Sequence, residues 1–167
     1  MKSNVIKLII CAKINHDGLA PVTVDGNCMF PLICDRDTVI IAPKHHYKVG
    51  DVVLVYVSQS LRVHRIVKIA DGIFYTKGDH SLFVDPIDQH IPKIIGLVVE
   101  DITKCLKLYR VPVISKLMSY VSIFESSVRK RYGVKAHIAC FDKLVTYLGY
   151  LELQYCKCRK TATNKAM

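Results

Sequence analysis

Short runs of β-branched and aromatic residues dominate residues 21–101, and no helical periodicity separates them. Glycine, proline and aspartate lie at the breaks, and Asp71-Gly72 has the sequence of a hairpin turn. The runs span residues 22–24, 38–41, 52–57, 61–69, 73–75 and 94–99. Closely spaced strands without crossover helices predict an antiparallel, partly closed β-structure.

Helical periodicity replaces this pattern after residue 111. Apolar residues recur at spacings of three and four over 113–128 and 138–151, on either side of a break at Tyr132-Gly133. The predicted fold class is therefore mainly β with a C-terminal α-helical hairpin. The expected divisions are an N-terminal edge segment (1–20), a β-domain (21–110), a basic amphipathic helical extension (111–160) and a disordered tail (161–167).

The N-terminal run over residues 5–12 is apolar but interrupted by Lys7, and we expect a short helix or strand that covers one edge of the core. It is far shorter than the roughly 20 apolar residues that cross a bilayer, so no membrane anchor is expected there. Seven cysteines without paired spacing indicate free thiols in a reducing compartment. We therefore expect a cytoplasmic location, with any membrane contact peripheral.

Most of the net charge of +10 belongs to the helical extension, because residues 111–167 hold 10 basic and 3 acidic side chains. Two interpretations stay open. The hairpin packs on the β-core or on a second copy with a solvated basic face, or it attaches to an anionic membrane surface or an acidic partner. Nucleic acid is not expected, because there is no zinc-finger spacing and no interleaving of aromatic and basic residues. Cys156 and Cys158 lack a second ligand pair, so neither a metal nor a cofactor is expected.

One turn presents a single reactive side chain. Gly26-Asn27 precedes Cys28, and Pro31 stiffens the chain just beyond it. Glycine at such a turn lets the backbone approach a substrate carbonyl, and its amides can face a developing oxyanion. Cys28 is thus a candidate nucleophile, although an isolated cysteine is more often a small buried hydrophobe.

His64 lies in an alternating strand pattern 36 residues after Cys28. An imidazole can take the proton of a thiol, so a cysteine and a histidine on neighbouring strands form a plausible nucleophile and base. The following turn carries Asp79 and Asp85, and either carboxylate is suited to orient the histidine.

Taken in order, these segments resemble the signal peptidase I and LexA-like serine peptidase superfamily. Gly26-Asn27-Cys28-Met29-Phe30-Pro31 matches the nucleophile box, except that cysteine replaces serine. His64 matches the histidine that serves as base in the SipW-type and endoplasmic-reticulum signal peptidases. The further matching segments are residues 50–56, 63–67, 76–79 with Asp85, and 95–99, so the resemblance covers about residues 21–101.

The resemblance implies an endopeptidase that binds an extended leader- or precursor-type peptide and works through a thioester. Cys28 would be the nucleophile, His64 the base and Asp85 the residue that orients His64, while Asp79 would fix its turn. Four other residues of the box would contact the substrate or the oxyanion: Gly26, Asn27, Met29 and Pro31.

The cysteine leaves alternatives open. It is compatible with a natural thiol enzyme, an engineered serine-to-cysteine replacement or a lineage that has lost catalysis. A catalytically silent peptide-binding module and a self-cleaving regulator of the same fold are the two other functions to weigh.

Overall fold

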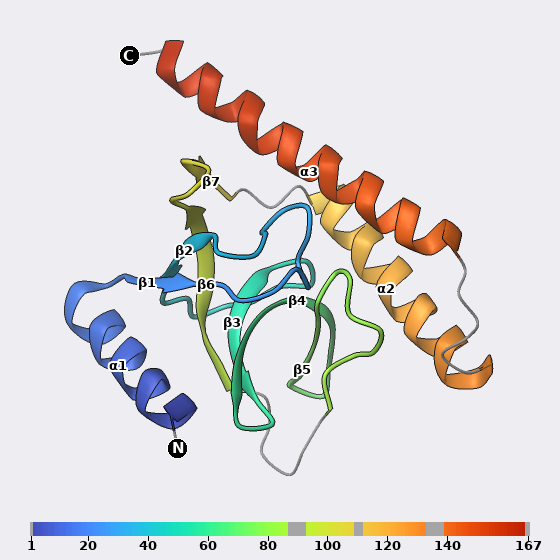
Figure 1. The fold of residues 1–167 in the computed structure, drawn as a ribbon, viewed down its shortest axis with the longest axis horizontal. Helices are drawn as coiled ribbons and strands as arrows, with labels where there is room; N and C mark the ends of the chain where they lie inside the picture. Colours follow the sequence, from blue (N-terminus) through green and yellow to red (C-terminus); the bar gives the residue numbers. More distant parts are fainter. Residues whose placement is uncertain (1, 87–92, 109–111, 133–138, 166–167) are drawn as a thin grey trace.

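The computed structural model describes residues 2–86, 93–108, 112–132 and 139–165. A β-sheet lies at the centre, with the N-terminal helix on one side of it and the two C-terminal helices on the other (Figure 1). The elements are α1 (Lys2–Asp17), β1 (Ala20–Thr23), β2 (Thr38–Ala42), β3 (Val52–Val57), β4 (Ser60–Ala70), β5 (Ile73–Lys77), β6 (Lys93–Asp101), β7 (Leu106–Lys107), α2 (Pro112–Tyr132) and α3 (Ala139–Lys165).

All pairings in the sheet are antiparallel, and the strand order is β1-β2-β6-β3-β4-β5, with β7 added to β6. The sheet bends strongly without closing (Figure 1). The turn between β4 and β5 is the predicted hairpin: Asp71 and Gly72 both have positive φ, at 51° and 74°. The antiparallel β-fold with C-terminal helices is thereby confirmed.

Strand β3 is buried on both faces, as its unbroken apolar sequence requires. Val52 and Leu54 face a core that also contains Met29 and Ile33 from the loop after β1. The alternate residues of β3, beginning at Val53, pack in a second cluster with Ile66 of β4. The register pairs Val53 with His64 and Val52 with Arg65, so these two neighbours on β4 point to opposite faces.

Both C-terminal helices form where the periodicity predicts them, and the break residues 133–138 lie outside the described residues. Their shared core is centred on Met118 and Leu148. Helix α3 continues to Lys165, which corrects the prediction of disorder from residue 161; residues 166 and 167 are not described. The reason is that residues 153–165 contain neither glycine nor proline to end the helix.

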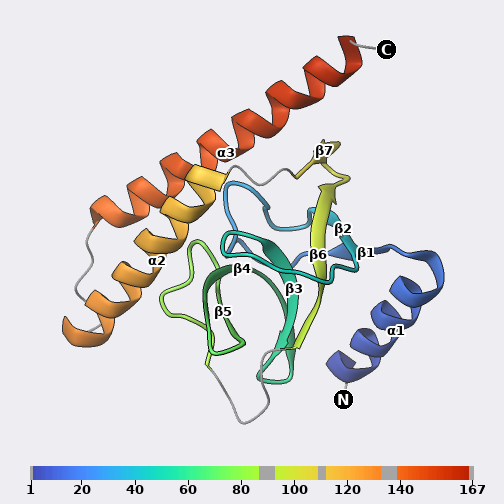
Figure 2. The same ribbon diagram turned by 180° about the vertical axis from the view of Figure 1, so that it is seen from behind.

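The N-terminal run, left open between helix and strand, is the helix α1. It buries Ile10 and Ile14 against the edge of the core. Two views of the molecule place α1 and the α2–α3 hairpin at opposite ends (Figures 1 and 2). No helix within the described residues combines the length and the hydropathy needed to cross a membrane.

Candidate active site

Cys28 lies in the loop that joins β1 to β2. Hydrogen bonds close the base of this loop, from Val24 N to Asp37 O at 2.9 Å and from Arg36 N to Val24 O at 2.9 Å. Asp35 braces it internally, because its carboxylate accepts the Gly26 N–H at 2.6 Å and its own N–H donates to the Asn27 side chain at 2.9 Å. The loop is thus held in one shape before any ligand binds.

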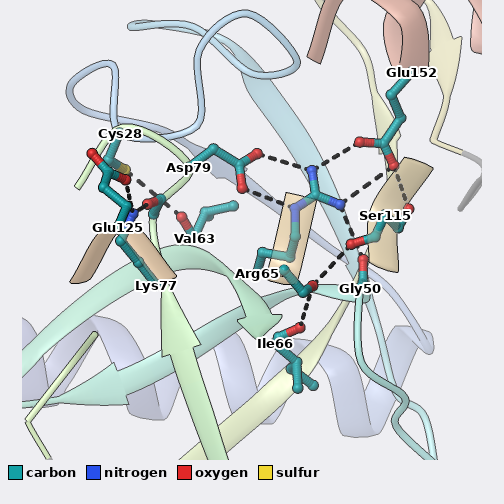
Figure 3. A network of polar contacts seen from close by, with 12 residues as sticks. Cys28, Gly50, Val63, Arg65, Ile66, Lys77, Asp79, Ser115, Glu125 and Glu152 are labelled. Carbon is teal, nitrogen blue, oxygen red and sulfur yellow. Dashed lines mark hydrogen bonds and ion pairs between the residues drawn. The ribbon is translucent and has the colours of Figure 1, made fainter. Parts of the chain in front are cut away.

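The turn at residues 78–81 holds Cys28 from the other side. His80 N donates to Cys28 O at 2.8 Å, and Ser81 N donates to Gly78 O at 2.9 Å. A side chain at Gly78 would place its Cβ 2.9 Å from the Cys28 Cβ, so this close approach requires glycine. The thiol itself points along β4, with its Sγ 3.8 Å from Val63 O (Figure 3).

His64 is paired with Asp85. The distance from His64 Nδ1 to Asp85 Oδ2 is 2.6 Å, and the histidine is only 3% exposed. Asp85 also accepts hydrogen bonds from Thr76 Oγ1 at 2.6 Å and from Arg62 Nη1 at 3.0 Å. Because a carboxylate only accepts, Nδ1 carries the proton in this pair and Nε2 is left for other chemistry.

The charges of this pair are mutually stabilised. Burial by itself lowers the pKa of His64, but hydrogen bonds and charge interactions with Asp85 and Cys28 outweigh it and raise that pKa to about 9. Burial raises the pKa of Asp85, yet its hydrogen bond to His64 and the charge of His64 bring that pKa below its usual value. His64 is therefore a stronger base than a free imidazole.

Cys28 and His64 line the same groove, which has a volume of about 620 Å³. Ser81 lies on it as well, and the helix α1 forms one wall. Helix α1 lines it with Ser3, Ile6 and Ile10. The apolar residues of the other walls are Val22, Val24, Leu54, Leu61 and Val63.

The structure therefore brings together three of the predicted site residues, Cys28, His64 and Asp85. Asp79 lies apart from them. Its two oxygens accept from Nε and Nη2 of Arg65, both at 2.9 Å, on the opposite face of β4 (Figure 3). Asp79 is part of the turn that holds Cys28, and its role in fixing that turn stays a prediction.

Four further residues of the nucleophile box, Gly26, Asn27, Met29 and Pro31, do not line the groove, and their contact with substrate stays a prediction. Gly26 gives its N–H to Asp35, and the Asn27 side chain accepts from the same residue. Met29 is fully buried in the core. Pro31 is buried against Gly149 of α3. These contacts hold the loop in its shape.

Three polar residues at the site were not singled out from the sequence. Arg62 and Thr76 both bind Asp85, and Ser81 faces the groove beside Cys28. Arg62 had a detectable signal, because it lies two residues before His64 and side chains at that spacing share a strand face. No sequence pattern marks Thr76 or Ser81 as a site residue, because only the folded chain brings them next to Asp85 and Cys28.

The helical hairpin is bound to the back of the site by buried ion pairs (Figure 3). Glu152 of α3 contacts Arg65 Nη2 at 2.9 Å, and Glu125 of α2 contacts Lys77 Nζ at 3.2 Å. The side chains of Arg65 and Lys77 are fully buried, so they depend on these carboxylates for compensation of their charge. The hairpin is therefore part of the structure that supports the site.

Helix α3 also touches the loop of Cys28 directly. The rings of Phe30 and Tyr150 meet edge to face at 6.1 Å, and Phe30 contacts His80 at 5.9 Å. His80 is also within 3.3 Å of the Thr146 hydroxyl. In the described part of the chain, no group of three or more histidine, cysteine and acidic side chains is arranged to hold a metal ion.

A model of one protein family matches this chain, and a search of curated proteins gave no match. The family is described as Peptidase S24-like, and the match spans residues 4–99. These residues include α1, the loop of Cys28, the strand of His64 and the turn of Asp85, whereas the helical hairpin lies beyond them. Because the match covers more than half of the 167 residues, the chain belongs to the Peptidase S24-like family.

Proposed function

We propose that this protein is an endopeptidase in which Cys28 is the nucleophile, His64 the general base and Asp85 the residue that orients the imidazole. The observation that carries the proposal is that His64, whose Nδ1 lies 2.6 Å from the Asp85 carboxylate, lines the same groove as the thiol of Cys28. This is the order of groups that activates a weak nucleophile. The histidine base and the family match together support a place in the histidine-base branch of the signal peptidase and LexA-like superfamily.

The proposed reaction has two steps. Because the pKa of His64 is about 9, the imidazole already holds the proton of the Cys28 thiol at neutral pH, and the resulting thiolate attacks the scissile carbonyl carbon. The C–N bond then breaks, the amine leaves with the proton from His64, and a thioester to Cys28 remains. In the second step His64 deprotonates water, which attacks the thioester, releases the new carboxyl terminus and restores the thiol. We assign the Cys28 N–H and the Ser81 hydroxyl to the oxyanion.

The proposed substrate is a peptide in extended form. Strand β1 ends the sheet on one side, and Val22 and Thr23 of this strand border the groove. An edge strand offers unpaired backbone groups to which a peptide can add as a further strand. The apolar walls of the groove favour apolar side chains around the cleaved bond, which suits a leader- or precursor-type segment.

The test is cleavage of a panel of leader-type peptides, followed by mass spectrometry. Cys28→Ala and His64→Ala are expected to reduce the cleavage rate by at least about 10³-fold, because each removes a member of the reacting pair. Cys28→Ser is expected to keep part of the activity, since a hydroxyl can replace the thiol. Cys105→Ala, which removes an exposed thiol elsewhere, is the control and should leave the rate unchanged. Cleavage that survives both alanine variants would exclude the proposal.

Self-cleavage is the second candidate, because the chain's own α1 forms a wall of the groove and the family match extends through it. Incubation of the purified protein tests this. A specific nick that depends on Cys28 would identify a self-cleaving regulator, whereas an intact chain that cleaves added peptides would identify a peptidase acting on other molecules.

A further inference from the structure

The outer surface of the helical hairpin carries an exposed apolar stripe. On α2 the stripe consists of Val113, Leu117, Tyr120 and Phe124, whose spacings of four, three and four residues place them on one side of the helix. Val113 is 77% exposed and Tyr120 is 70% exposed. Three apolar or aromatic side chains of α3 are exposed as well: Leu144, Tyr147 and Tyr155. We call this surface, together with the exposed cations Lys116 and Arg131 of α2, the hairpin outer face.

The opposite side of α2 packs against α3 and the sheet. Met118 is buried between the helices, and Ser119 and Glu125 are buried towards the sheet, where they bond to Ile66 O and Lys77. Apart from Phe124, whose ring lies 5.6 Å from that of Phe141, the side chains of the stripe take no part in the hydrophobic clusters of the described residues. Contiguous exposed apolar side chains of this kind are typical of a surface that meets a partner.

The exposed charge of the hairpin is almost entirely basic. Residues 111–167 contain only three acidic residues. Glu125 and Glu152 are buried and pair inward with Lys77 and Arg65, and Asp142 pairs with Arg129 at 3.6 Å. The exposed charged side chains in the described part of the hairpin are otherwise all basic: Lys116, Lys130, Arg131, Lys143 and Lys157.

We propose that the hairpin outer face docks on the surface of an anionic lipid bilayer. Lysine and arginine would lie among the lipid phosphates, while leucine, phenylalanine and the amphipathic tyrosines would enter the headgroup region. A second copy fits this face less well, because two copies would bring the same cations together without exposed carboxylates to balance them. The helices would lie in the interface, since neither has the length and hydropathy to cross it within the described residues.

Docking in this way leaves the groove open. The groove is bordered by α1, which lies at the other end of the molecule from the hairpin (Figures 1 and 2). Phe30 and the buried ion pairs connect the hairpin to the loop of Cys28, so the docked helices would hold the site at a fixed orientation to the bilayer. This inference is independent of whether the groove cleaves peptides.

The experiment is flotation of the full-length protein with vesicles of phosphatidylcholine alone or with about 30% phosphatidylglycerol. We expect binding to the anionic vesicles only, and at least about tenfold weaker binding at high salt, because exposed charges are screened. Lys116→Glu with Arg131→Glu and, separately, Val113→Ser with Tyr120→Ser are each expected to weaken binding by at least about tenfold. These side chains are exposed, so circular dichroism melting should show that both double variants stay folded.

Matched controls are available on α1, where Leu8 is exposed and Lys13 is half-exposed. Leu8→Ser and Lys13→Glu repeat the two kinds of change at the other end of the molecule and should leave vesicle binding unaltered. Absence of binding to anionic vesicles, equal binding to neutral ones, or binding that survives both hairpin double variants would overturn the proposal. So would a concentration-dependent dimer that Val113→Ser with Tyr120→Ser abolishes, in a protein that binds no vesicles, because a second copy would then cover this face.

Discussion

His64 and Arg65 are neighbours on β4, and the two faces of that strand use a buried charge in different ways. His64 turns to the groove, where it meets one carboxylate, that of Asp85, and the thiol of Cys28. Arg65 turns to the helices, where two carboxylates and a backbone carbonyl surround it: Asp79, Glu152 and Gly50 O. Both side chains are almost completely buried.

The two side chains differ in whether they can release a proton at working pH. The guanidinium stays charged at every working pH, and the charges of Asp79 and Glu152 outweigh burial and raise its pKa further. The imidazole has a pKa of about 9 and faces an exchangeable thiol proton. One strand thus carries a fixed ion pair that joins the helices to the sheet and, one residue away, a titrating pair suited to chemistry.

The largest expected effect comes from exchanging the two aspartates for asparagine. Asp85→Asn is expected to lower kcat/KM for peptide cleavage by about 10³–10⁴-fold, because an amide can impose the wrong imidazole tautomer. Asp79→Asn is expected to act mainly on stability, since it weakens the pairing of Arg65. Peptide kinetics and urea unfolding of both variants separate these effects. A severe catalytic loss confined to Asp79→Asn, at unchanged stability, would reverse the roles given to the two residues.

Removal of the fixed charge comes next. Arg65→Met leaves two buried carboxylates without their partner and is expected to lower the free energy of unfolding by about 3–5 kcal/mol. Lys68→Met, at an exposed position of the same strand, is the control, with an expected change within about 0.5 kcal/mol. Urea unfolding measures both. Equal stabilities of the two variants would show that the Arg65 network does not hold the hairpin to the sheet.

The titrating pair predicts a specific dependence of stability on pH. The pKa of His64 is raised from 6.5 to about 9 on folding, so its contribution is complete below pH 6.5 and is lost as pH rises through 9. The expected loss is about 3 kcal/mol in the free energy of unfolding. Urea unfolding between pH 6 and pH 9.5 should show this slope in the wild type and a much smaller one in His64→Gln. The same slope in both proteins would place its origin elsewhere.

The contact between the hairpin and the Cys28 loop gives the smallest effect. At Gly149 an added Cβ would lie 2.5 Å from Pro31 Cδ, so Gly149→Ala must displace the loop or the helix. We expect a loss of about 1–3 kcal/mol in stability and a lower kcat with little change in KM. Gln154→Ala, at an exposed position of the same helix, should alter neither quantity. Wild-type kinetics in Gly149→Ala would mean that α3 does not position the loop.

The sequence predicted the strands because their signals are local. The β-branched runs, the Asp71-Gly72 turn and the alternation around His64 each lie within a few neighbouring residues. It could not distinguish helix from strand over the short apolar run that became α1, since such a run suits both. The end of α3 lies beyond the predicted boundary at residue 160, in a segment without helix breakers.

The supporting ion pairs were missed for a different reason. Glu152 lies 87 residues from Arg65, and Glu125 lies 48 residues from Lys77. In an amphipathic helix, a glutamate that reaches a buried partner has the same local pattern as one that faces water. The burial of Met29 and Pro31 was not predicted, because a motif gives the order of residue types but not the side of the loop on which each side chain lies.

The most direct measurement is the alkylation rate of Cys28 at neutral pH, followed by mass spectrometry of the fragment that contains it. The thiolate is the reacting form, so a histidine that accepts the thiol proton should speed the reaction. If the two groups share a proton, His64→Gln slows alkylation of Cys28 by about tenfold or more, while the exposed Cys105 in the same molecules reacts at an unchanged rate. Equal rates for Cys28 in the two proteins would show that the imidazole does not activate the sulfur.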